Sequence, residues 1–461
     1  MKVIHQLVIL FLTIISTVVY SQPSGTGLKD SDNIHLITID PGHFHAALVQ
    51  KEMYPGIDSV VNVYAPDGPE LQAHLNLIKQ YNERKENPTN WVEQVYTGKN
   101  YLEKMLAEKK GNVVVIAGNN RLKTQYIKKT IAAGINVLGD KPMVINYADF
   151  NMLQQSFVAA GEKKLLLYDI MTERSEITNI LQRELSQIPA VFGELQKGTL
   201  NDPSVILESV HFFYKYVSGK TLTRPDWFFD PRQQGDAITD VGTHLIDLAQ
   251  WECFPEQSID YKKDIKILSS KTWTTPLGLS QFTLLTKKDA FPSFLHQYVK
   301  NDTVLQTHAD GEINYTLKNI HVKIIARWDY KAPEGSGDTH YSMLKGTKAT
   351  LEIRQGKEEG FLPALYIIPA SEKQANNFTA DLNKAIEKLH VAYPGVTVEK
   401  NAKGWKVIIP EKYKVGHEAH FGQVMQRYLQ FLKEKKLPAW EVPNMIAKYY
   451  TSTKALEMAT R

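Results

Sequence analysis

The first third of the chain alternates short apolar runs with helical segments. The run at 34–39 stops at Asp40, Pro41 and Gly42, and the run at 112–118 is almost wholly apolar, as expected of a parallel strand buried on both faces. Such alternation is typical of right-handed crossovers in a doubly wound parallel sheet. The pattern predicts strands at 34–39, 59–64, 112–118, 136–139 and 165–168, with a helix over 122–133.

The pattern changes after about residue 172. Strand-like segments follow one another with turns between them, and residues 321–328 alternate in polarity, which indicates a sheet with one wet face. The predicted fold class is α/β, with a Rossmann-like doubly wound parallel sheet followed by an α+β domain with a large, mostly antiparallel sheet. The second part is predicted to hold strands at 205–216, 265–274, 280–285, 315–328 and 349–354 and helices at 235–252, 371–390, 417–435 and 442–458.

The N-terminus has the pattern of a Sec-type signal peptide. Lys2 precedes an apolar run over 7–20, and Val19 and Ser21 occupy the −3 and −1 positions of a cleavage site. We expect residues 1–21 to be removed on export to the periplasm or the medium, with no stable membrane insertion afterwards; a membrane anchor is the alternative. The rest divides into a Rossmann-like domain at 22–171, a substrate domain at 172–415 and C-terminal helices at 416–461 that pack back on the first domain.

Composition narrows the class of protein further. With 461 residues, 43% of them hydrophobic, the chain is expected to form two or three globular domains. The 54 Lys and Arg against 50 Asp and Glu give a net charge of only +4, which argues against nucleic acid as the main partner. A single cysteine, Cys253, excludes an intrachain disulfide and a cysteine-rich zinc site.

Two motifs could carry chemistry. Lys141 follows the predicted strand at 136–139, and ligands of open parallel sheets bind beyond the carboxyl ends of the strands. Asp240, His244 and Asp247 fall on one stripe of a predicted helix. The alternatives are an exposed lysine before a turn proline and a structural histidine. A metal site on this stripe is weaker, because no third ligand has convincing spacing.

These motifs resemble those of the Gfo/Idh/MocA family of oxidoreductases, which includes glucose-fructose oxidoreductase and inositol dehydrogenase. The resemblance covers roughly residues 34–355 and is closest to secreted members with a distinctive C-terminal oxidoreductase domain, found in polysaccharide-degrading bacteria. It implies a nicotinamide cofactor, NAD or NADP, and a sugar or polyol substrate, which we expect to be a sugar or oligosaccharide. Because free NAD(P) is expected to be scarce outside the cytoplasm, we expect the cofactor to be tightly bound. The matching features are the segment 132–142 with Lys141 and Pro142, Arg174, the segment 224–227, the segment 240–247 and the segment 346–351.

The resemblance also implies roles for individual residues. Lys141 would orient the substrate hydroxyl, His244 would act as the acid and base, and Asp240 would position the substrate or His244. Asp247 would orient the histidine or cap the helix. Arg174, Arg224, Trp227 and Asp247 are the candidate substrate contacts, and a hydrophobic plug between domains is the alternative for the aromatic cluster at 227–229.

The phosphate-binding turn departs from the family pattern. Only Gly42 matches the usual glycines of a dinucleotide turn, while Asp40 brings a carboxylate and His45 fills a small-residue position. Asp67 lies two residues beyond the place expected for the ribose-binding acid. His43, His45 or Lys123 could contact phosphate instead, and a metal site at the histidine pair is the less favoured alternative. The candidate cofactor contacts are Gly42, His43, Phe44, His45, Asp67, Asn119, Asn120, Lys123, Asp140 and Lys141, and no metal site is predicted.

These expectations leave three hypotheses for the function. The first is an exported NAD(P)-dependent oxidoreductase that acts on the CH–OH group of a sugar, in polysaccharide degradation. The second is redox-neutral, NAD-dependent cleavage of a glycoside, and the third is a carbohydrate-binding protein with a degenerate nucleotide site. The open faces of the second sheet would also allow a homo-oligomer.

Overall fold

A computed structural model describes residues 33–217, 220–334, 336–371 and 375–460 of the chain. The predicted signal peptide at 1–21 lies outside the described residues. Within the part of the chain described, no helix is both long and apolar enough to cross a membrane.

The first domain is built on a parallel sheet of six strands in the order β3-β2-β1-β4-β5-β6. This confirms the predicted Rossmann-like sheet. The edge strand β3 was not predicted, because most of its side chains are exposed and it has no apolar run. The strands are β1 (Leu36–Ile39), β2 (Val60–Ala65), β3 (Val92–Thr97), β4 (Val113–Ile116), β5 (Asn136–Asp140) and β6 (Leu167–Ile170), and the helices are α1 (His45–Leu48), α2 (Pro69–Glu83), α3 (Tyr101–Glu108), α4 (Lys123–Ala132) and α5 (Tyr147–Lys163).

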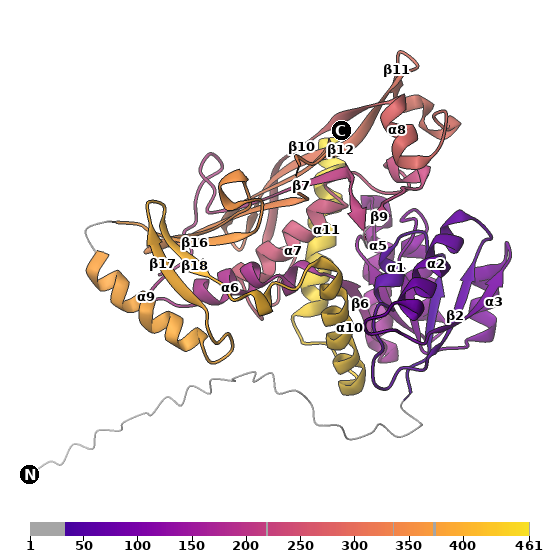
Figure 1. Cartoon of the computed structure of the whole chain (residues 1–461), viewed down its shortest axis with the longest axis horizontal. Helices are drawn as coiled ribbons and strands as arrows, with labels where there is room; N and C mark the ends of the chain where they lie inside the picture. The colour runs from indigo at the N-terminus through magenta and orange to yellow at the C-terminus, as the bar shows by residue number, and fades with distance from the viewer. Residues whose placement is uncertain (1–32, 218–219, 335, 372–374, 461) are drawn as a thin grey trace, which may run out of the picture.

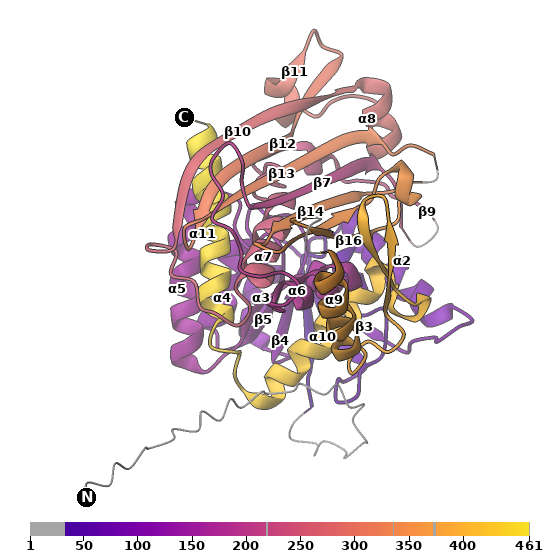
Figure 2. The same cartoon turned by 90° about the vertical axis from the view of Figure 1, so that its left-hand side faces the viewer.

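A ten-stranded sheet follows, in which β11 pairs only with β12 and the other strands run β10-β12-β13-β7-β14-β15-β16-β18-β17. Only the β13–β7 pair is parallel, so the predicted mostly antiparallel sheet is confirmed. Figure 2 shows its strands side by side above α6, α7 and α11. The strands are β7 (Val205–Tyr214), β10 (Ile265–Gly278), β11 (Val299–Lys300), β12 (Val304–Leu317), β13 (Ile320–Lys331), β14 (Thr339–Lys345), β15 (Ala349–Arg354), β16 (Ala364–Pro369), β17 (Thr397–Asn401) and β18 (Gly404–Ile408), and β8 (Tyr216–Val217) and β9 (Lys220–Thr221) form a separate pair.

Two predicted strands of the second domain were wrong in detail. The segment predicted as a strand at 280–285 is a helix, because its buried residues Phe282 and Leu285 are spaced by three and Gln281 accepts the Gly278 N–H at its start. The predicted strand at 315–328 is a hairpin of β12 and β13, whose two-residue turn has positive φ at both positions.

The helices of this domain are α6 (Ile177–Ser186), α7 (Val241–Cys253), α8 (Leu279–Thr286) and α9 (Ala375–Leu389), with short 3-10 turns η2 (Glu173–Ser175), η3 (Asp226–Phe229), η4 (Ser293–Tyr298) and η5 (Lys357–Glu359).

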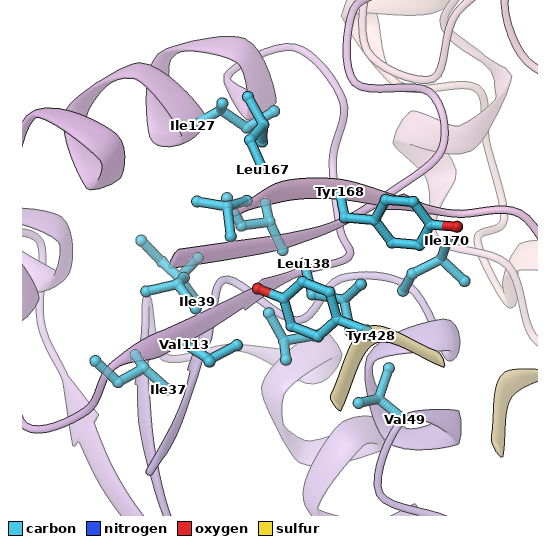
Figure 3. Packing of buried hydrophobic residues seen from close by; sticks show 14 of the residues in the cluster. Ile37, Ile39, Val49, Val113, Ile127, Leu138, Leu167, Tyr168, Ile170 and Tyr428 are labelled. Atoms are coloured by element: carbon cyan, nitrogen blue, oxygen red, sulfur yellow. The ribbon is translucent and has the colours of Figure 1, made fainter. Parts of the chain in front are cut away.

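The chain ends in two helices, α10 (His417–Glu434) and α11 (Glu441–Ala459), which follow the turn η7 (Glu411–Tyr413). They lie between the first domain and the large sheet (Figure 1). Tyr428 of α10 is fully buried and stacks near Tyr168 of β6, with ring centroids 6.1 Å apart (Figure 3). Helix α11 contacts α5, α7 and β10. The last helices therefore complete the core of the first domain.

Five charged side chains form a buried cluster where β6, η2, α7 and α11 meet. Lys448 Nζ lies 2.6 Å from Asp169 Oδ2 and 2.8 Å from Asp247 Oδ1. Arg174 binds Asp247 with two nitrogens, at 2.6 and 2.7 Å, and Glu441 with a third at 2.9 Å. Burial opposes ionisation of Asp247, but the charges of Arg174 and Lys448 lower its pKa to about 2. This buried ion cluster joins the two domains.

We expect Lys448→Met to lower the free energy of unfolding by about 3–5 kcal/mol, because it leaves the carboxylate of Asp169 buried without a cation, although Asp247 keeps its ion pair with Arg174. The control is Lys79→Met, which removes an ion pair with Glu83 whose side chains are 69% and 65% exposed, and should change stability by less than about 1 kcal/mol. Urea unfolding of both variants measures the difference. Equal effects would show that the cluster contributes no more than a surface pair.

Candidate active site

A cavity of about 1130 Å³ lies at the carboxyl end of β5, between the first domain, the large sheet and α10. Its walls come from segments far apart in the sequence. Half of the chain's 14 histidines line it: His43, His45, His211, His244, His340, His417 and His420.

The cavity brings together the three predicted catalytic residues. Lys141 directly follows β5, and its Nζ lies 2.7 Å from Oδ1 of Asp240. Asp240 is the N-cap residue of α7, and His244 lies one turn further along the same helix. Gln234 donates to the second oxygen of Asp240 at 3.2 Å. All of these side chains line the cavity, so the spacing of Asp240 and His244 does place them on one face.

Burial and charge set the protonation of this group. Burial lowers the pKa of His244 well below its usual value, and the positive charge of Lys141 lowers it further. Burial alone would raise the pKa of Asp240, but the charge and hydrogen bond of Lys141 bring it below the ordinary value. His244 Nδ1 is buried and has no hydrogen-bond partner among the described residues. Near neutral pH the site therefore holds a carboxylate–ammonium pair beside a neutral imidazole that can accept a proton.

A second hollow, a groove of about 240 Å³, lies beside the turn after β1. Asp40 there has φ of 46°, a left-handed conformation that a dinucleotide turn usually gives to glycine. Tyr126 donates to its carboxylate at 3.0 Å, and burial raises the pKa of Asp40. A Cβ on Gly42 would lie 3.2 Å from Cζ2 of Trp227, which is closer than an ordinary van der Waals contact, so the Trp227 ring packs here without crowding only on glycine.

The groove and the cavity adjoin at one segment, because Gly118 lines the cavity and Asn119 lines the groove. A Cβ on Gly118 would lie 2.1 Å from the carbonyl oxygen of Asp40, so the close approach of the two turns requires glycine. Two adjoining hollows at the carboxyl ends of parallel strands fit the two halves of a dinucleotide. The predicted cofactor contacts divide between them: Gly42, Asp67 and Asn119 line the groove, and His43, Phe44, His45, Asn120, Asp140 and Lys141 line the cavity.

Two family models match the chain. Residues 42–168 match the model "Oxidoreductase family, NAD-binding Rossmann fold" (GFO_IDH_MocA). Residues 181–460 match the model "Putative oxidoreductase C terminal domain".

The chain belongs to the Gfo/Idh/MocA oxidoreductase family. A crystal structure of a "putative oxidoreductase" from Parabacteroides merdae ATCC 43184 is 54% identical, covers 93% of this chain and 98% of its own, and superposes with a TM-score of 0.91. Comparison of the sequence with curated proteins gives no match.

More distant structures share the fold of this oxidoreductase. Levoglucosan dehydrogenase, solved with NADH and levoglucosan, is 12% identical over 93% of this chain and 97% of its own, with a TM-score of 0.57. A 3-ketoreductase from Actinomadura kijaniata, solved with NADP and TDP-benzene, is 12% identical over 93% of this chain and 97% of its own, with a TM-score of 0.54. NAD binding by the first domain rests on the family model that matches residues 42–168, and these distant structures show the shared fold.

Lys123 cannot make the phosphate contact suggested for it. Its side chain is buried, and its ammonium donates to the backbone oxygen of Asp140 at 2.9 Å. Burial lowers its pKa to about 8. The lysine was suggested as a replacement phosphate contact for the altered turn, but it lines neither the groove nor the cavity.

The candidate substrate contacts also lie differently from the prediction. Arg174 and Asp247 belong to the buried ion cluster and line neither hollow. Trp227 covers Gly42 in the groove and does not line the cavity. Arg224 does reach the cavity wall, but it donates to the backbone oxygens of Phe212 and Phe213 at 3.1 and 2.7 Å. Of the four candidate substrate contacts, only Arg224 lines the cavity.

Most of the opposite wall of the cavity was not predicted from motifs. Asp338 is held there by Lys215 at 2.8 Å and by His211 at 3.2 Å. Glu173 faces the same space, and burial raises its pKa to about 7. These residues come from β7, the residue after it, η2 and the loop after β13, and no sequence spacing links them. No motif or spacing in the sequence pointed to this wall.

We expect the buried His420 of α10 to make the oxidoreductase less stable in acid. Burial lowers its pKa to about 4, whereas an unfolded histidine titrates near 6.5. Because the unfolded chain binds more protons between these values, stability falls as pH decreases. His420→Asn should reduce the loss of unfolding free energy between pH 7 and pH 5 by about 2 kcal/mol. Urea unfolding at both pH values tests this, with His321→Asn as the control, and equal losses in the two variants would contradict it.

Proposed function

We propose that this protein is an exported, NAD-dependent oxidoreductase that acts on a CH–OH group of a sugar or oligosaccharide. The observation that carries the proposal is the buried group of Lys141, Asp240 and His244, which faces the cavity where the strands of the Rossmann sheet end. The coarser part, a family of NAD-binding oxidoreductases, rests on the family models.

The residues of this group divide the work of alcohol oxidation. His244, neutral and buried, accepts the proton of the substrate hydroxyl. Lys141 donates to the hydroxyl oxygen and stabilises the negative charge that develops on it, while Asp240 holds the ammonium in place. NAD, when bound, supplies the acceptor of the hydride. Because the group is shielded from bulk water, its charges act at higher strength than they would at the surface.

The cavity has room for a sugar substrate beside the half of the dinucleotide that would enter it. Its volume of about 1130 Å³ exceeds the usual range for small-molecule sites, which is roughly 300–1,000 Å³. The aromatic side chains of Trp328, Phe228, Tyr214 and Tyr216 line it and can stack on the apolar faces of sugars. Levoglucosan dehydrogenase, which shares the fold, binds a sugar derivative. These features support an oligosaccharide substrate in polysaccharide degradation.

Contacts between the domains support tight binding of the cofactor. Trp227 covers Gly42, and the backbone N–H of Asn120 donates to Gln233 at 2.9 Å. The side chains of Asn119 and Asn120 donate to Gln233 Oε1 and Gln234 O at 2.9 and 2.6 Å. The segment 225–235 of the second domain is thus bound to the two turns that border the groove. Contacts of this kind would slow release of the cofactor, as we expect of a protein that its predicted signal peptide exports to a compartment poor in NAD.

Glu173 favours redox-neutral glycoside cleavage as the second candidate function. Oxidation of a sugar carbon acidifies its neighbour, and elimination of the glycosidic oxygen then needs a second acid–base group. With its pKa raised to about 7 by burial, Glu173 can take that role on the same cavity. A homo-oligomer formed through the large sheet stays a prediction.

The first test is to denature the purified protein and measure released NAD(P) by mass. Turnover is then followed as NADH formation with levoglucosan, glucose, inositol and cellobiose. We expect His244→Ala to lower kcat by about 10²–10⁴-fold, because the proton acceptor is lost, with NAD binding by calorimetry unchanged. His321→Ala, on the large sheet, is the matched control. Full activity of the His244 variant would refute its role as the base.

We expect NAD to bind at least about tenfold more tightly than NADP, a difference of roughly 1.4 kcal/mol. Three carboxylates line the groove, from Asp40, Asp67 and Glu70, against one cation from Arg121, and negative charge disfavours an additional phosphate. Calorimetry with each nucleotide measures the ratio. Asp67→Ala should reduce it, whereas Asp202→Ala, far from the groove, should not. Equal binding of both nucleotides would contradict the preference.

A further inference from the structure

His43, His45 and Asp140 converge on one point of the cavity wall. His45 Nδ1 lies 3.0 Å and His43 Nδ1 lies 3.6 Å from the same oxygen, Oδ2 of Asp140. Ligand atoms of all three residues lie within 4.8 Å of one another. The histidines flank the turn after β1, and Asp140 ends β5, so the parallel sheet brings together residues 95 positions apart.

We propose that these three residues bind a divalent transition-metal cation. Zinc lies about 2.0–2.2 Å from nitrogen and oxygen ligands, so neighbouring ligands of a tetrahedral ion are about 3.3 Å apart, close to the separations seen here. Two imidazoles and a carboxylate form a ligand set that suits Zn²⁺ or Fe²⁺. The proposal concerns binding of the ion and does not depend on hydride transfer.

The carboxylate is better explained by a bound ion than by a single ion pair. Two imidazole rings approach Oδ2 of Asp140, while its Oδ1 is buried without a hydrogen-bond partner among the described residues. His43 Nδ1 also accepts the backbone N–H of His45, at a long 3.4 Å, but a lone histidine–aspartate pair would need only one of these rings. A cation between the three groups would be bound by both imidazole rings, and the carboxylate of Asp140 would give it a lone pair that no hydrogen bond uses.

The surroundings hold the ligands in place. The ring of His45 packs against Phe421 and Phe44, with centroids 4.6 and 4.5 Å apart. The backbone of Asp140 is fixed by Lys123. Such support is typical of metal sites, where packing around the ligands keeps their geometry.

One side of the proposed site is open. The His43 side chain is 18% exposed, and all three ligands line the cavity. Three protein ligands with an open position are the pattern of a catalytic rather than a structural zinc site. Since Asp140 precedes Lys141, an oxygen of a molecule in the cavity could bind the ion close to the Lys141–Asp240 pair. The ion would then polarise that oxygen as a Lewis acid.

The test is a titration of the protein, without a histidine tag and after treatment with EDTA, with Zn²⁺ against a chromophoric chelator. We expect one ion per chain. His45→Ala and Asp140→Asn should weaken binding at least about 100-fold, because ligands contribute at least as much as their outer-shell partners. His321→Ala should bind as the unchanged protein does.

His43→Ala is the second variant, because its partly exposed side chain can be removed with little effect on folding. It should also weaken Zn²⁺ binding, with an unchanged circular dichroism spectrum in EDTA. Failure of the unchanged protein to bind Zn²⁺, or equal binding by all of the variants, would overturn the proposal. NAD binding is measured separately in EDTA, so that loss of the metal site and loss of the proposed oxidoreductase function are distinguishable.

Discussion

The pairing of Lys448 with Asp169 and Asp247 is the constraint on which the arrangement of the site depends. A charge buried without a partner is costly, so the elements that carry these side chains can dock in only one register. Helix α7 carries both Asp247, which joins the cluster, and His244, which lies one turn earlier. The ion cluster therefore fixes the position of the His244 imidazole relative to the end of β5, although the residues of the cluster do not line the cavity.

The turn after β1 shows how a family pattern can be altered without loss of its shape. Asp40 takes the left-handed conformation of a glycine, and Tyr126 binds the carboxylate that results. The change has a cost, because the N–H groups of Gly42 and His43 donate to Asp40 O and Ala117 O within the protein. A dinucleotide phosphate here would need other donors, and Arg121 on the groove is the cation in reach.

Much of the fold could be predicted from the sequence, because buried parallel strands such as β4 are continuous apolar runs. The edge strand β3 lacked that signal, and the helix α8 was mistaken for a strand because its short apolar segment fits both periods. In the site, Lys141 and the pair Asp240 and His244 follow from local motifs. Their meeting is tertiary, as is the contact of Asp140 with two histidines, and such contacts depend on how strands and helices pack.

The shared core has a consequence for how the chain folds. The sheet of the first domain is completed by α10 and α11, which are made well after it during synthesis (Figure 3). Until the final helices are available, side chains such as Tyr168 and Leu138 lack part of their apolar cover. Because contacts between the first domain and these helices join residues as far as 367 positions apart, they are slow to form and give the chain a high contact order. A nascent chain of this kind would depend on protection from aggregation until α10 and α11 have emerged and packed on the sheet.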